Sequence, residues 1–361
     1  MSGMSSRYYP TQPAPPFQLD WNNSYYQVKI HDAQVVFAGN WFQQADTVLV
    51  STEVALTANP DKPIKSLYKV DMIQRNTPMR LGLSPSLTDW LPAQTDSQVH
   101  LTLQYTVVQG TPFKTLLDKM VSANLAGVAS LIRPDLGVAL KITEIVGRVI
   151  SYFAGEGNAN NVFALTMDLS SVDLQAGYHV TIGSKEDVPR LDPALLKIDS
   201  QGQLVYTPAS TLDRLSYLVI QVQGIPQRQS EAVRWTTWGT LLATAQAQIL
   251  DEPPPTDAGA RQQAFIEWRA VLKQVRALAR QDRSFLLTEI DGVIAAAQKQ
   301  VEAHLVPPTA VQSAGLNEYD DAWQDVLGVS SKEELLRSVR DYQDALMLTE
   351  ALLQHYNAAV S

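Results

Sequence analysis

The chain has 361 residues, of which 45% are apolar and 18% charged, so it is long enough for two domains with cores of their own. It contains no cysteine, which excludes disulfides, thiolate nucleophiles and cysteine-ligated metal or iron–sulfur centres. The net charge of −9 is concentrated near the C-terminus, where residues 230–361 carry 11 Lys and Arg against 18 Asp and Glu. An acidic surface repels phosphate backbones, and we therefore expect no nucleic-acid partner.

The N-terminal residues predict neither export nor a membrane anchor. No stretch there joins positive charge to an apolar run, as a secretory signal does. No window of the chain approaches the roughly 20 uninterrupted apolar residues of a membrane-spanning helix. We therefore expect a cytoplasmic protein. Residues 1–20 are rich in Pro and Ser and lack periodicity, which predicts a flexible tail.

Residues 21–229 alternate between apolar and polar side chains in many short stretches, which is typical of half-buried strands. Helical patterns are not interleaved regularly with these stretches, so we predict an antiparallel β-sandwich and not a parallel sheet. The predicted strands are centred on Tyr26–Ile30, Val48–Leu56, Tyr68–Met72, Val99–Val107, Phe163–Met167, Tyr178–Ile182, Leu204–Tyr206 and Leu218–Val222.

Residues 113–153 interrupt the strands with apolar residues at helical spacing, broken at Arg133-Pro134-Asp135. We predict an α-helical hairpin inserted into the sandwich. Two interpretations stay open: the hairpin packs permanently on the sheet, or it is released and enters a lipid bilayer. In the second case the side chains that contact lipid include Leu125, Val128, Ile142, Ile145, Val149 and Phe153.

Residues 230–361 repeat one pattern four times, with apolar residues spaced alternately three and four apart. This spacing forms a narrow apolar stripe along one side of a helix, which is stable only against another helix. We therefore predict an all-α helical bundle, and for the whole chain an α+β multidomain protein. The stripes contain Trp235, Trp238, Leu242, Ala245 and Ile249; Phe265, Trp268, Leu272, Val275 and Ala279; Leu287, Ile290, Ile294, Ala297 and Val301; and Leu335, Val339, Tyr342, Leu346, Thr349, Leu353 and Tyr356.

Common catalytic signatures are missing from the sequence. It has no phosphate-binding loop ending in Lys-Ser or Lys-Thr, no serine between glycines in a nucleophile elbow, and no paired-histidine metalloprotease motif. We therefore assign no catalytic, cofactor-binding or metal-binding residue and expect no cofactor. His31, His100 and His179 each lie in a strand-like stretch. On adjacent strands they would form a metal or acid–base site; the alternative is that they are exposed on a solvated face.

These features favour a non-catalytic adaptor or assembly protein whose partner is another protein or a second copy of the chain. Aromatic side chains are preferred interface anchors, although tryptophan on a helical stripe more often packs in a core. Two other functions stay open: a membrane-active effector that uses the hairpin at 113–153, and an enzyme or metal-binding protein that uses the histidines. The candidate residues for contact with a partner are Trp235, Trp238, Trp268, Tyr342 and Tyr356.

Overall fold

The structure is a computed structural model of the chain, and it describes residues 7–9, 17–35, 46–56, 64–73, 79–81, 86–94, 98–108, 159–170, 174–183, 195–199, 203–207, 212, 215–305, 326–328 and 331–358. Within these residues the fold is mixed α+β, with antiparallel sheets up to Ile225 and five helices from Ser230 onward. The predicted hairpin at 113–153 lies outside the described residues.

The larger sheet, which we call sheet A, has strand order β1-β9-β12-β2-β5, and β6 also pairs with β2. Its first strand differs from the expectation of a flexible tail, because the backbone of β1 pairs with Tyr178–Val180 of β9. The strands of sheet A are β1 (Arg7–Tyr9), β2 (Tyr25–Val35), β5 (Met79–Leu81), β6 (Leu91–Pro92), β9 (Gly177–Gly183) and β12 (Ser216–Ile225).

The second sheet, sheet B, has four strands in the order β4-β3-β7-β8, all antiparallel. Apolar side chains of both sheets form one buried cluster, in which Val28 and Ile220 of sheet A join Leu101 and Met167 of sheet B. The antiparallel pairing predicted from the alternation is confirmed. The strands of sheet B are β3 (Asp46–Leu56), β4 (Ile64–Ile73), β7 (Val99–Val108) and β8 (Ala159–Leu169).

Strand β12 is buried along its whole length, whereas the alternation of Leu218, Ile220 and Val222 predicted one solvated face. Its other face is covered by a small antiparallel pair, β10 (Leu196–Ile198) and β11 (Leu204–Tyr206), whose residues cluster with Tyr217 and Val219. Apolar residues on both faces are what a strand covered on two sides requires.

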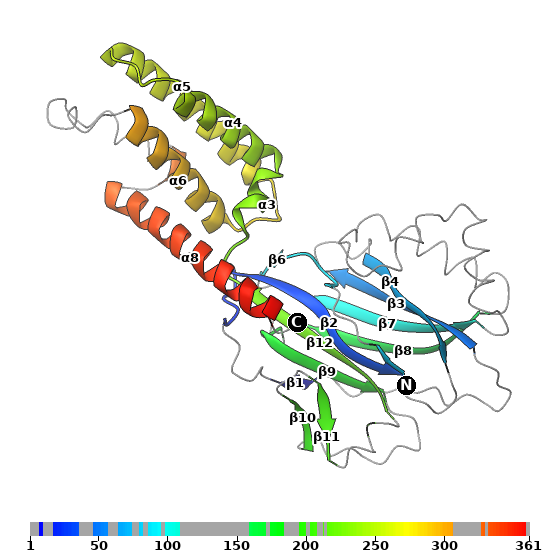
Figure 1. Ribbon diagram of the computed structural model, residues 1–361. Coiled ribbons are helices and arrows are strands. Elements are labelled where there is room, and N and C mark those ends of the chain that lie inside the picture. Colours follow the sequence, from blue (N-terminus) through cyan, green and yellow to red (C-terminus); the bar gives the residue numbers. More distant parts are fainter. Residues whose placement is uncertain are drawn as a thin grey trace.

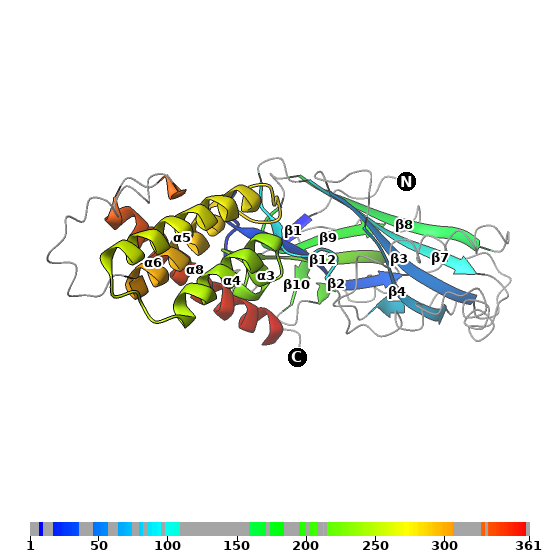
Figure 2. The same ribbon diagram turned by 90° about the horizontal axis from the view of Figure 1, so that it is seen from above.

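The helices begin directly after β12 and lie at one end of the sheets (Figures 1 and 2). Four of them, α4, α5, α6 and α8, carry the four predicted stripes. Their common core includes Trp268, whose indole Nε1 donates to Gln298 Oε1 at 2.8 Å, and Trp238, whose ring meets Phe285 edge-on. The helices are α3 (Ser230–Arg234), α4 (Thr237–Asp251), α5 (Ala258–Ala279), α6 (Leu287–Leu305) and α8 (Lys332–Ala358).

Trp235 does not lie on the first stripe as predicted. The helix breaks at this residue, which caps the C-terminus of α3, and the Thr236 hydroxyl accepts from Gly239 N at 2.9 Å to start α4. A threonine that caps a helix has extended backbone, so the stripe does not continue through it. Trp235 is consequently 88% exposed, while Trp238 is buried.

Candidate functional site

The residues predicted to contact a partner have different environments. Trp238 and Trp268 are buried in the core between the helices. Tyr356 is buried where α8 meets the end of sheet A, and Tyr342 is half-buried between α6 and α8. Of the five, only Trp235 presents its ring to solvent. The six residues predicted to contact lipid lie outside the described residues.

The three histidines are not brought together. His179 of β9 is 1% exposed and stacks at a tilt on Tyr8 of β1, on the side of sheet A that faces sheet B. His31 of β2 contacts the Tyr178 ring in the cluster on the opposite face. His100 lies in sheet B. Across the described part of the chain, no three His, Asp or Glu side chains gather in a way that could hold a metal ion.

His100 nevertheless has polar neighbours on the exposed face of sheet B. Its Nδ1 contacts Asp168, its ladder partner on β8, and its Nε2 lies 3.3 Å from the hydroxyl of Thr102, two residues along β7. A carboxylate, an imidazole and a hydroxyl that lie next to one another in this order resemble the orienting acid, base and nucleophile of hydrolytic sites. In the part of the chain that the structure describes, both His100 and Asp168 are exposed, whereas the residues of such sites usually lie in a cavity that excludes water.

A second and more buried polar group lies where the helices meet sheet A; we call it the seam. The Tyr25 hydroxyl of β2 accepts from Leu286 N at 2.6 Å and donates to Glu289 on α6. The other oxygen of Glu289 accepts from Arg228 N at 3.0 Å. Glu289 is 3% exposed, so these two donors replace most of the solvation that water would otherwise give to its carboxylate.

Arg228 lies in the short linker between β12 and α3 and fills the space beside this carboxylate. Its guanidinium donates to the carbonyl of Trp90 and lies 5.0 Å from the Phe285 ring centre and 5.5 Å from that of Tyr25. Arginine stacked on aromatic rings favours a fixed position. The linker is thereby held from both the sheet side and the helix side.

Helix α8 is joined to the same segment through peptide groups. The Tyr356 hydroxyl donates to Gly224 O at 2.8 Å and accepts from Gly224 N at 3.3 Å. Thr349 repeats this pattern on Gln227, donating to its carbonyl at 2.9 Å and accepting from its N–H at 3.3 Å. Each hydroxyl satisfies both polar groups of one residue, which fixes α8 in register with the end of β12.

The electrostatics of the seam are dominated by burial. Desolvation raises the pKa of Glu289 from 4.5 to about 7, although hydrogen bonds from Tyr25 and Arg228 and the charge of Arg228 act in the opposite direction. Burial, followed by the nearby charge of Glu289, raises the pKa of Tyr342 to about 12, so this phenol stays neutral.

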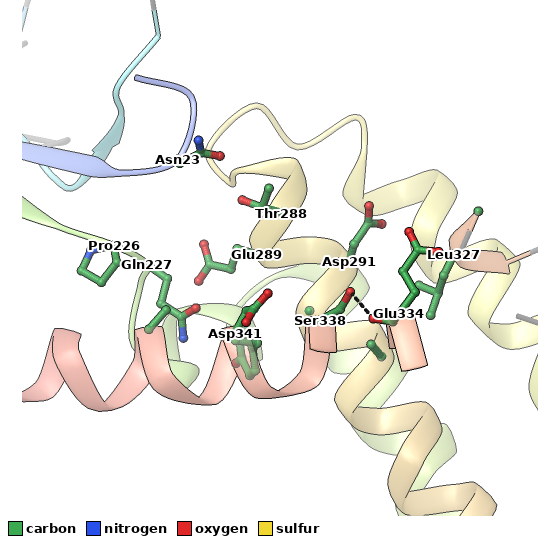
Figure 3. A pocket seen from close by; sticks show the side chains of 15 residues that line it. Asn23, Pro226, Gln227, Thr288, Glu289, Asp291, Leu327, Glu334, Ser338 and Asp341 are labelled. Atoms are coloured by element: carbon green, nitrogen blue, oxygen red, sulfur yellow. Dashed lines mark hydrogen bonds between the residues drawn. The ribbon is translucent and has the colours of Figure 1, made fainter. Parts of the chain in front are cut away.

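A cavity of about 440 Å³ opens beside the seam, between α6, α8 and the linker (Figure 3). Its size falls within the range of small-ligand sites. Four carboxylates line it, and none of its lining residues is Lys, Arg or His. Gly292, which also lines the cavity, lets α6 and α8 approach closely, because a Cβ there would lie 2.8 Å from the Tyr342 Cβ. The four carboxylates belong to Glu289, Asp291, Glu334 and Asp341.

Sequence reasoning missed this site. Glu289 is in the first turn of α6, where an acidic side chain is ordinarily explained by the helix dipole. Its burial depends on Tyr25, 264 residues earlier in the chain, and no local pattern connects the two. The only sequence signal is the proximity of Glu289, Asp291, Glu334 and Asp341 to the apolar stripes of their helices.

No family model, curated protein or solved structure matches this chain. The residues and their geometry are therefore the basis of the functional argument. Among the described helices, none is both long and apolar enough to cross a lipid bilayer.

Proposed function

We propose that the protein is a non-catalytic adaptor or assembly protein, in which a β-sandwich at about residues 21–229 carries a helical bundle at 230–361 that binds a protein partner. Trp235 is the observation that carries this proposal. A tryptophan that is 88% exposed at a helix end contributes little to the core, whereas tryptophan is strongly enriched among residues that dominate binding energy.

The surroundings of Trp235 support the same function. The seam fixes the helices on the sheets, and a rigid surface loses less entropy on binding than a mobile one. Trp238 and Trp268 stabilise the core beneath, so that Trp235 is free to contact a partner without cost to the fold.

The test compares the full chain with Trp235→Ala in two measurements: light scattering over a concentration series, and crosslinking capture from a native lysate. Ile266→Ala is the matched control, because Ile266 is an exposed apolar residue on α5. We expect self-association or capture of a defined protein by the wild type and the control, and its loss in Trp235→Ala. A chain that is monomeric and captures nothing, or a partner that binds the Trp235 variant equally well, refutes the proposal.

The Asp168–His100–Thr102 arrangement favours a second candidate, a hydrolytic enzyme in which His100 accepts the Thr102 proton. The test is saturable hydrolysis of an activated ester by the wild type, His100→Gln and Thr102→Val. His355→Ala controls for background reaction at an exposed imidazole. A rate that is linear in substrate, or unaffected by His100→Gln, rules this candidate out.

A further inference from the structure

Strand β1 resembles a peptide bound to the edge of a sheet. It has three residues, Arg7–Tyr9, and among the described strands it pairs with β9 alone, at the edge of sheet A (Figure 1). Pro10 follows it, and a proline has no N–H with which to extend the ladder. Residues 10–16, four of which are prolines, connect it to Phe17. A segment this short at a sheet edge can leave its site without unfolding the sheet.

The site that β9 offers to this segment is shaped for a tyrosine. The Tyr8 hydroxyl donates to Ala176 O at 3.0 Å, and the ring lies at a tilt to that of His179, with ring centres 5.4 Å apart. Gly177 makes the approach possible, because a Cβ there would lie 2.6 Å from Tyr8 Cε2 and 2.9 Å from the carbonyl oxygen of Tyr9. Its φ of +149° also favours glycine. A hydrogen bond, a ring contact and the space above a glycine together select tyrosine at this position.

The next residue of the segment lies on the opposite face of sheet A, as alternation along a strand requires. Tyr9 is half-buried there and packs against the apolar cluster that includes Tyr178 and Leu196. Packing of this kind accepts other aromatic or large aliphatic side chains. The pattern that fits the edge of β9 is therefore a tyrosine followed by an apolar residue, in an extended segment.

We propose that the edge of β9 is a binding site for an extended, tyrosine-containing segment of a protein partner, and that β1 occupies this site until such a segment displaces it. Addition of a strand to a sheet edge is a common mode of peptide recognition, in which backbone hydrogen bonds give affinity and side-chain pockets give specificity. The inference goes beyond the proposed contact at Trp235 and does not depend on it, because β9 lies in sheet A and Trp235 at a helix end.

A separate partner is favoured over a second copy of the chain. Exchange of β1 between two copies forms the contacts that each copy already makes within itself, and it costs the translational freedom of one molecule. A strand tied to its own site also has an effective concentration in the millimolar range. A partner overcomes this advantage with contacts outside the edge of β9, whereas the exchange of identical strands creates no new contact at this edge.

The test is calorimetric titration of the full chain with a synthetic peptide that copies residues 6–12, Ser-Arg-Tyr-Tyr-Pro-Thr-Gln. Tyr8→Ala in the protein removes the hydroxyl and the ring that hold β1, so the site opens. We expect the peptide to bind Tyr8→Ala with a Kd below about 1 mM, because β1 is bound within the chain at an effective concentration of this order. The wild type is expected to bind at least about tenfold more weakly, because its open site is a minor population. Equal affinity for both proteins, or no binding to Tyr8→Ala, overturns the proposal.

Peptide variants identify the contacts without altering the protein. Phenylalanine in place of the tyrosine that corresponds to Tyr8 removes the hydrogen bond to Ala176 O, so it is expected to weaken binding to the Tyr8→Ala protein about three- to tenfold. Alanine at this position, or a scrambled sequence, is expected to abolish measurable binding. A scrambled peptide that binds equally well, or a phenylalanine peptide as tight as the tyrosine peptide, contradicts a site selective for tyrosine.

A protein variant locates the site. Gly177→Ala, introduced together with Tyr8→Ala, places a Cβ where the tyrosine ring of the peptide lies, so it is expected to abolish binding. Circular dichroism shows whether the double variant is folded. In the Tyr8→Ala protein itself, bound peptide is expected to slow hydrogen exchange in residues 177–183. Binding that persists in the folded double variant, or exchange that the peptide does not slow, contradicts the placement at β9.

Two controls separate this inference from the contact at Trp235 and from self-association. Trp235→Ala is expected to bind the peptide as weakly as the wild type, whether or not it has lost its partner, so the two proposals can fail independently. Tighter peptide binding by Trp235→Ala would show that the edge of β9 is not an independent site. Light scattering of the wild type and Tyr8→Ala tests strand exchange. A wild-type dimer that Tyr8→Ala dissociates would identify a second copy as the occupant and overturn the choice of a separate partner.

Discussion

Replacing Glu289 by glutamine is expected to change how the stability of the protein depends on pH. The folded protein holds the Glu289 proton with a pKa of about 7, against 4.5 for the ordinary carboxyl. Because the folded state binds this proton more tightly, its contribution to stability is fully present below pH 4.5 and is lost as pH rises through about 7. Glutamine cannot ionise, so the variant lacks this loss.

The size of this pH effect on stability follows from the raised pKa of Glu289. A difference of one pKa unit corresponds to about 1.36 kcal/mol, so raising the pKa from 4.5 to about 7 makes ionisation cost about 3 kcal/mol of folding free energy in total. Most of this loss, about 2.5 kcal/mol, falls between pH 5 and pH 8. Glutamine also loses one of the hydrogen bonds from Tyr25 or Arg228, which lowers its stability by about 1 kcal/mol at every pH.

The assay is urea denaturation of the wild type and Glu289→Gln at pH 5, 6, 7 and 8 at fixed ionic strength, followed by tryptophan fluorescence and circular dichroism. The difference in unfolding free energy is expected to shift by about 2.5 kcal/mol in favour of the variant as pH rises. Glu267→Gln, an exposed position on α5, is the control and is expected to parallel the wild type. A difference that stays within about 0.5 kcal/mol over this range, or that moves in favour of the wild type, refutes the assignment of Glu289 as a buried carboxyl.

Three other substitutions test the packing. Gly292→Ala would place a Cβ 2.8 Å from the Cβ of Tyr342. It is therefore expected to lower the unfolding free energy by about 1–3 kcal/mol, despite the better helix propensity of alanine. An unchanged or raised melting temperature contradicts the close approach of α6 and α8. Tyr356→Phe removes both hydrogen bonds to Gly224. It is expected to lower the unfolding free energy by about 1–3 kcal/mol and to speed hydrogen exchange at the Gly224 amide. Exchange that stays slow would show that the hydroxyl does not protect this amide. Trp235→Ala is expected to change stability by less than about 0.5 kcal/mol, and a larger loss in thermal unfolding would show that the ring is not exposed.

Periodicity was sufficient to locate the longer elements. The stripe through Phe265 and Trp268 coincides with α5, and Val99–Val107 coincides with β7, because each pattern continues over several turns or several residue pairs. Strands β1, β5 and β6 have two or three residues each, too few for an alternation to be visible. Their pairing depends on longer strands that lie far away in the sequence.

Local signals in the sequence explain two of the differences between the predicted and the observed structure, the exposure of Trp235 and the burial of both faces of β12. Thr236 is a good helix cap, and reading it as such would have ended α3 at Arg234 and removed Trp235 from the stripe. Similarly, apolar Tyr217 and Val219 beside Leu218 and Ile220 fit a strand buried on both faces better than a half-buried one.

The seam and the cavity could not be predicted in this way, because both are formed by contacts between distant segments. Glu289 becomes buried only when β2 and the linker after β12 reach the start of α6. Secondary structure prediction identifies the helix that carries the carboxylate, but it does not identify the donors that allow a carboxylate to be buried there.

The hydrogen bonds from α8 also connect the seam to the cavity between α6 and α8. Thr349 binds both peptide groups of Gln227, the same residue whose side chain lines the cavity, so the wall formed by the linker is fixed relative to the wall formed by α8. Thr349→Val keeps the shape of the side chain and removes its hydroxyl, so it is expected to lower the unfolding free energy by about 1–3 kcal/mol and to speed hydrogen exchange at the Gln227 amide. Unchanged stability together with slow exchange in this variant would show that the linker holds its position without the hydroxyl.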